Sequence, residues 1–98
     1  MITYDLIGQT PLVLLESFSD EHVQIYAKLE QFNPGGSIKD RLGKYLVETA
    51  LKEKRVVKGD TIVEATAGNT GIGLAMAANR YHLKCVIFAP EGDRKSVV

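Results

Sequence analysis

The fold is decided by residues 61–90, which read TIVEATAGNTGIGLAMAANRYHLKCVIFAP. Residues 61–65 predict a strand, residues 72–81 predict a helix that is apolar nearly all round, and residues 84–89 predict a second strand. The second strand is continuously apolar, which is typical of a strand buried in a parallel sheet. We therefore expect a parallel βαβ unit that carries a glycine-rich loop after its first strand.

Two further strands are predicted upstream of this unit. Residues 10–15 form a short apolar run, and residues 23–29 alternate between apolar and polar side chains. Residues 33–36, Asn-Pro-Gly-Gly, then break the chain. Together with the helix described next, these elements predict an α/β fold in the order strand, strand, helix, strand, helix, strand.

The helix after this break is predicted from capping and periodicity. Ser37 fits an N-cap, and Asp40 three residues later completes a capping box. Glu48 and Lys52 are spaced for an ion pair on the solvent side of the helix. The predicted apolar stripe consists of Ile38, Leu42, Leu46, Val47, Ala50 and Leu51.

Composition limits the class of protein. The 98 residues hold twelve basic and twelve acidic side chains, so no positive excess favours nucleic acid or an anionic membrane. No apolar run approaches the roughly 20 residues of a membrane span. The lone Cys85 excludes an internal disulfide and a cysteine-cluster metal site, and His22 and His82 lack metal-ligand spacing. We therefore expect a soluble, cytoplasmic protein without a metal.

Lys39 is the first candidate for chemistry. It lies near the positive end of the predicted helix dipole, with Arg41 close by and Asp40 partly offsetting the charge. These surroundings favour the neutral amine, which is the form that attacks a carbonyl. The alternative is that Lys39 simply points into solvent.

The glycine-rich loop, residues 66–71, is the second candidate. Backbone N–H groups at the start of a helix bind carboxylate or phosphate, and glycines let the anion approach. The glycines at 68, 71 and 73 do not follow the dinucleotide fingerprint, and no P-loop is present. A tight turn with glycines chosen for packing is the alternative. A small nucleotide-binding protein would fit this loop but would leave the Lys39 segment unexplained.

Three segments carry a resemblance to a known family. Residues 33–41, NPGGSIKDR, resemble the pyridoxal-phosphate lysine motif of the cysteine synthase/cystathionine β-synthase family. Residues 66–73, TAGNTGIG, resemble its substrate-carboxylate loop, and residues 7–13, IGQTPLV, resemble its N-terminal signature. The resemblance covers residues 2–91, and its detail is most similar to the bacterial O-acetylserine-dependent cystathionine β-synthases.

The resemblance implies a fold-type II pyridoxal 5'-phosphate enzyme with a defined set of site residues. Lys39 would form the Schiff base with the cofactor, and Asn69 would hydrogen-bond the hydroxyl of the pyridine ring. The substrate carboxylate would be held by Thr66, Gly68, Asn69 and Thr70. The implied reaction is β-replacement on O-acetylserine or serine, in which homocysteine gives cystathionine and sulfide gives cysteine. The intact enzyme would be a homodimer.

The resemblance also implies a division of the chain. Residues 1–36 would belong to the larger cofactor domain, residues 37–91 to part of a smaller α/β domain, and residues 92–98 form a tail that does not match. Ala67 stands where many members have serine. The family's cofactor-phosphate loop lies in a later part that has no counterpart here. We therefore expect an incomplete N-terminal part that is inactive alone; the alternative is a non-catalytic remnant or interaction module.

Overall fold

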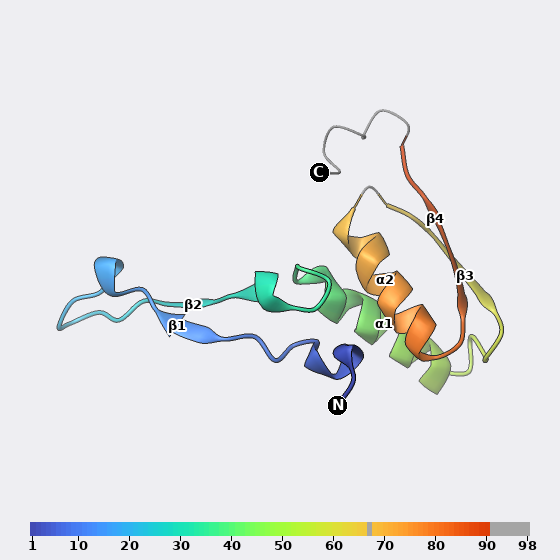
Figure 1. The fold of residues 1–98 in the computed structure, drawn as a ribbon, viewed down its shortest axis with the longest axis horizontal. Coiled ribbons are helices and arrows are strands. Elements are labelled where there is room, and N and C mark those ends of the chain that lie inside the picture. Colours follow the sequence, from blue (N-terminus) through green and yellow to red (C-terminus); the bar gives the residue numbers. More distant parts are fainter. Residues whose placement is uncertain (67, 91–98) are drawn as a thin grey trace.

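The computed structural model describes residues 1–66 and 68–90, and its strands and α-helices follow the predicted order (Figure 1). The strands and helices are β1 (Leu12–Leu14), β2 (Tyr26–Lys28), α1 (Lys39–Lys52), β3 (Thr61–Ala65), α2 (Asn69–Arg80) and β4 (Lys84–Phe88). Three short 3-10 turns that were not predicted are η1 (Thr3–Leu6), η2 (Glu16–Phe18) and η3 (Glu30–Phe32). The α/β class is confirmed.

The strands form two separate two-stranded sheets. β1 pairs antiparallel with β2, so that Val13 lies opposite Ala27, and β3 pairs parallel with β4, so that Val63 lies opposite Val86. The β1–β2 hairpin extends away from the helices (Figure 1). The radius of gyration is therefore 16.6 Å, whereas a compact domain of this length has about 13 Å. Assignment of residues 1–36 and 37–91 to two domains stays a prediction, and the tail lies outside the described residues.

The core lies between α1, α2 and η1. Its buried apolar side chains are Tyr4, Ile7, Val47, Leu74, Ala77, Ala78 and Leu83. The two helices cross where Gly43 faces Gly73, and a Cβ atom on Gly43 would collide with the Gly73 backbone. A Cβ atom on Gly73 would likewise collide with the backbone carbonyl of Lys39. This close approach is what fixes α1 against α2.

The predicted apolar stripe of α1 is confirmed only in part: Val47 lies in the core and Leu51 packs against it, but three other members face outward. Ile38 is 54% exposed, and Leu42 and Leu46 are exposed as well. The reason is that α2 packs on the face that carries Gly43 and Val47, both of which are buried. Glycine adds no hydrophobic signal, so the pattern of large side chains selects the neighbouring face.

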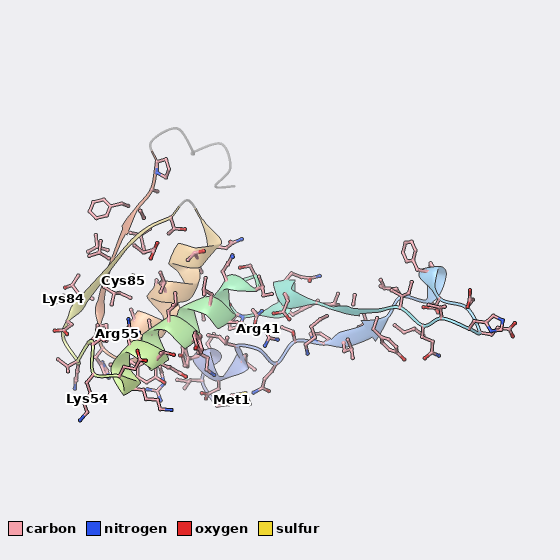
Figure 2. All side chains as sticks on the ribbon, turned by 180° about the vertical axis from the view of Figure 1, so that it is seen from behind. Met1, Arg41, Lys54, Arg55, Lys84 and Cys85 are labelled. Atoms are coloured by element: carbon pink, nitrogen blue, oxygen red, sulfur yellow. The ribbon has the colours of Figure 1, made fainter. Side chains whose placement is uncertain are left out.

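Strand β4 is also less buried than a continuous apolar run predicts. Val86, Ile87 and Phe88 are exposed, because β3 is the one strand that pairs with β4 in the described part of the chain and α2 lies on one side of this sheet (Figure 1). Cys85 is half-buried and packs against the core, as expected, and Figure 2 marks its place on this strand. Burial raises the pKa of the Cys85 thiol.

The predicted capping box at the start of α1 is wrong. Ile38 occupies the N-cap position, and its own side chain makes no capping hydrogen bond. Ser37 lies one residue too early, and its hydroxyl accepts a hydrogen bond from the Lys39 amide at 3.1 Å. The Asp40 carboxylate, which is fully buried, accepts a hydrogen bond from the Gly35 amide instead. The turn before Lys39 is therefore held by Ser37, which precedes Lys39, and by Asp40, which follows it.

Candidate active site

Lys39 is the first residue of α1, and its side chain is exposed. Its backbone carbonyl lies against Gly73 of α2 because the two helices approach closely there. Figure 1 shows that both helices begin at the same end of the pair. The fold therefore brings the start of the Lys39 helix next to the start of the helix that follows the glycine-rich loop.

The glycine-rich segment is shorter as a loop than predicted. α2 begins at Asn69 rather than at residue 72, so Asn69 and Thr70 lie in its first turn. Gly68 is the N-cap and has no side chain to accept the first amide protons. Thr66 follows β3 directly, and its amide donates to the Phe88 carbonyl at 3.0 Å.

This first turn has the chemistry of an anion site. Among residues 1–66 and 68–90, no side chain caps the amides of Asn69 and Thr70, and a Cβ atom placed on Gly68 would meet nothing within 4 Å. Asn69 and Gly68 are exposed, whereas Thr66 and Thr70 are half-buried. Backbone amides at a helix start without a capping side chain suit a carboxylate, which the helix dipole would also favour. Ala67, where the departure from the family pattern falls, lies outside the described residues.

A polar network beside Lys39 was missed by the sequence analysis. The sequence suggests that Arg41 adds a free positive charge near Lys39, but its guanidinium is paired with the Glu30 carboxylate. Hydrogen bonds from Arg41, and next from Thr10, lower the pKa of Glu30 to about 2. The spacing of residues along the sequence does not predict these contacts, because Glu30 and Thr10 lie far from Arg41 in the chain, next to the β1–β2 hairpin.

A second cluster joins α1, α2 and η1. The hydroxyls of Tyr4 and Tyr81 both donate to Oε2 of Glu48, at 2.7 and 2.6 Å, and the two rings meet edge to face. Burial raises the pKa of Glu48, but the bonds from Tyr81 and Tyr4 outweigh it, so the net pKa is lowered. The predicted solvent-facing pair of Glu48 with Lys52 is therefore wrong. We call these three residues the tyrosine clamp.

The start of α1, with its exposed lysine, thus packs against the first turns of α2. Residues 3–98 match the sequence model of a family described as "Pyridoxal-phosphate dependent enzyme", and the chain belongs to this family. The predicted cofactor and family are thereby confirmed.

Relatives make the likeness more particular. The chain is 57% identical over 88 residues to the O-acetylserine dependent cystathionine beta-synthase of Bacillus subtilis, covering 89% of this chain and 29% of the relative. It is 46% identical over 91 residues to a cysteine synthase of Helicobacter pylori, covering 89% of this chain and 30% of the relative. The chain thus spans less than a third of the length of these curated relatives.

Solved structures agree with the sequence relatives. A cystathionine beta-synthase from Bacillus anthracis superposes with a TM-score of 0.79 at 50% identity, over 96% of this chain and 36% of that one. O-ureido-L-serine synthase superposes with a TM-score of 0.80 at 43% identity, over 95% of this chain and 31% of that one. The predicted fold type is confirmed by these neighbours.

The residues present fit pyridoxal phosphate and an amino-acid substrate. Lys39 offers an exposed amine for an aldehyde carbon, and Asn69 offers an exposed amide for a ring hydroxyl. The uncapped turn offers amides for a carboxylate. Within residues 1–66 and 68–90, no helix has the length and apolar character to cross a membrane, and no group of three metal-binding side chains gathers.

Proposed function

We propose that this chain supplies the reactive lysine and the carboxylate site of an enzyme for β-replacement on O-acetylserine or serine. The observation that carries the proposal is the packing of the start of α1 against the first turns of α2: the backbone of the exposed Lys39 lies against Gly73, about one turn after the helix start at Asn69. The names of the relatives support this reaction class, since they include cystathionine beta-synthase and cysteine synthase.

Each candidate residue has a distinct task in this proposal. Pyridoxal phosphate supplies an electron sink when bound. The Lys39 amine would hold the cofactor and later move the proton at the substrate α-carbon. Asn69 would donate its amide to the ring hydroxyl, while Thr66, Gly68 and Thr70 would join it in orienting the carboxylate. Two hydroxyls and several amides suffice for this, although Ala67 contributes no hydroxyl.

A chimera tests the proposal directly. The part of the Bacillus subtilis relative that matches this chain is replaced by residues 1–90, and acetate release from O-acetylserine is measured with homocysteine or sulfide. We expect turnover that Lys39→Ala abolishes and that Lys58→Ala, a change on an exposed turn, leaves intact. Comparison of the two acceptors identifies the second substrate. A folded chimera without turnover would support the non-catalytic alternative and contradict the proposal.

The 98-residue chain alone tests a second part of the proposal. We expect it to be inactive and to bind pyridoxal phosphate weakly, because the family's phosphate loop has no counterpart in its sequence. Absorbance above about 400 nm during cofactor titration measures this binding, since a protonated imine of the cofactor absorbs there. A strong, saturable band that Lys39→Ala removes would show that the chain is sufficient. Homodimer formation and a cytoplasmic location stay predictions for the whole protein.

A further inference from the structure

Arg41 lies at the junction of α1 with two segments that are distant in the sequence (Figure 2). Its Nη2 donates to the Gly8 carbonyl at 3.0 Å and to the Thr10 hydroxyl at 3.2 Å. Its Nε and Nη2 also meet the two carboxylate oxygens of Glu30, so this pair is bidentate. A bidentate pair fixes the direction of the guanidinium as well as its distance.

Asn33 extends this network into the turn that precedes Lys39. Its side-chain amide donates to the backbone and carboxylate oxygens of Glu30 at 2.9 and 3.1 Å, and its oxygen accepts the Gly8 amide at 2.8 Å. Asn33 is only 3% exposed, so these bonds satisfy polar atoms in the interior. Its backbone carbonyl accepts the Gly36 amide at 2.8 Å. The network therefore closes the turn three residues before Lys39.

The Lys39 side chain has no hydrogen-bond or ion-pair partner of its own within the described ranges, 1–66 and 68–90. The backbone on either side therefore fixes where its side chain starts, and the reach of the amine is centred on that point. The turn of residues 33–38 lies before it, and α1 begins with it. Arg41, two residues beyond Lys39, is tied through Glu30 to the same Asn33 that closes this turn.

We propose that Arg41, paired with Glu30, is a positioning residue for the Lys39 amine. It acts through the turn of residues 33–38 rather than on a reacting atom, and the inference rests on the proposed role of Lys39. A lysine at position 41 would keep the positive charge but lose the planar fork. Arg41→Lys should therefore release the turn without changing the net charge.

Chemical trapping measures the position of the amine. The 98-residue chain is incubated with pyridoxal phosphate, reduced with borohydride and digested, and the labelled lysines are quantified by mass spectrometry. The exposed lysines at 52, 54 and 58 serve as internal references. We expect preferential labelling of Lys39 in the wild type, and in Arg41→Lys a fall in that preference on the order of tenfold, because small displacements cost reactivity steeply. Arg55→Lys, which alters an exposed pair with Glu53, should leave the preference unchanged.

Amide exchange followed by NMR gives a second readout that does not depend on the cofactor. The Gly36 amide, bonded to Asn33, should exchange faster in Arg41→Lys, while amides in the middle of α2 keep their protection. Glu30→Gln should show the same faster exchange at Gly36 with protection kept in α2. This variant tests the positioning role if Arg41→Lys does not fold.

Three outcomes separate the possibilities. Unchanged labelling preference together with unchanged Gly36 exchange in Arg41→Lys would overturn the positioning role. Equal loss of protection in α1 and α2 would also overturn it, because Arg41 would then act on stability in general. If wild-type Lys39 shows no preferential labelling either in this chain or in the chimera, the proposed function fails, while local Gly36 exchange still supports or refutes the control of the turn by Arg41.

Discussion

Helix α1 is held near its start and in its second half by different chemistry. Near the start, the charged side chains of Arg41 and Glu30 pair with each other and bind the Gly8–Thr10 segment. In the second half, the Glu48 carboxylate accepts hydrogen bonds from two neutral donors, Tyr4 and Tyr81. The first contact joins α1 to the hairpin side of the chain, and the second joins it to α2 and η1.

This difference separates two tasks. The Arg41 network sets the turn that carries Lys39, whereas the tyrosine clamp sets the angle between the helices whose starts form the candidate site. The crossing of Gly43 with Gly73 lies between them and serves both. Substitutions can therefore remove one contact and leave the other, and the two contacts should respond differently to pH.

Gly43→Val should lower the stability most, because it disrupts the packing of α1 on α2 on which both the Arg41 network and the tyrosine clamp depend. The added side chain would collide with the Gly73 backbone, which has no flexible end to move away. We expect the free energy of unfolding to fall by about 3 kcal/mol or more, at the upper end of overpacking costs. Urea unfolding followed by circular dichroism measures it, with Ala75→Val on the exposed side of α2 as the control. A folded variant of near wild-type stability would show that the helices do not need this approach.

Tyr81→Phe should have a smaller effect that is confined to the clamp. It removes one hydrogen bond to a carboxylate and keeps the ring, so we expect a loss of about 1–2 kcal/mol. Tyr45→Phe, on an exposed ring of α1, is the matched control and should change little. Labelling of Lys39 in the trapping experiment should keep its preference. A loss of that preference in Tyr81→Phe would mean that the two contacts are not separable.

The sequence predicts the order of elements because strand periodicity, the break at residues 33–36 and helical spacing are local signals. Lys39 and Asn69 lie in recognisable motifs, and their roles in chemistry stay predictions. The start of α2 is missed by three residues because Gly68 to Gly71 have the composition of a loop. Helical conformation there depends on packing against β4 and α1, which local propensity does not contain.

The contacts between distant segments could not be predicted. Glu48 has the spacing of a solvent-facing ion pair with Lys52, and only the return of Tyr4 and Tyr81 to the same place turns it inward. Gly43 gives no hydrophobic signal, yet it selects the packed face of α1 because another backbone approaches it. Both misses concern partners more than 25 residues away, beyond the reach of any periodic pattern.

Alkaline pH should weaken the clamp and leave the Arg41 network intact. Burial, and then the bond to Glu48, raise the pKa of Tyr4 and of Tyr81 above their ordinary value. A raised tyrosine pKa contributes stability that is complete below about pH 10 and is lost as pH rises further, while the guanidinium stays charged. Unfolding between pH 8 and 11 should therefore show a steeper loss in wild type than in the double variant Tyr4→Phe/Tyr81→Phe. Equal slopes would contradict the assignment of the shift to these two hydroxyls.

Acid pH should produce the smallest loss of stability, and this loss should come from the Arg41 network. The pKa of Glu30 is about 2 in the folded chain, with the hydrogen bond from Arg41 as its first cause, against about 4.3 for an ordinary glutamate. A lowered carboxyl pKa contributes stability that is present above about pH 4.3 and is lost as pH falls towards 2. The effect is small because the Arg41 side chain is 40% exposed and solvent screens the pair.

Glu30→Gln sharpens this last test, since it removes the titrating group and keeps the size of the side chain. Unfolding from pH 6 down to pH 2 should show a shallower loss in Glu30→Gln than in wild type, while Glu21→Gln, an exposed control, should follow wild type. Glu48 and Asp20 also have lowered pKa values, so part of the acid loss will persist in Glu30→Gln and should shrink further when Glu48→Gln is added. Glu30→Gln alone could remove the whole dependence of the free energy of unfolding on acid pH. The ionisation of Glu48 would then contribute no stability to the tyrosine clamp, and the clamp would differ from the Arg41 network only through its tyrosine hydroxyls.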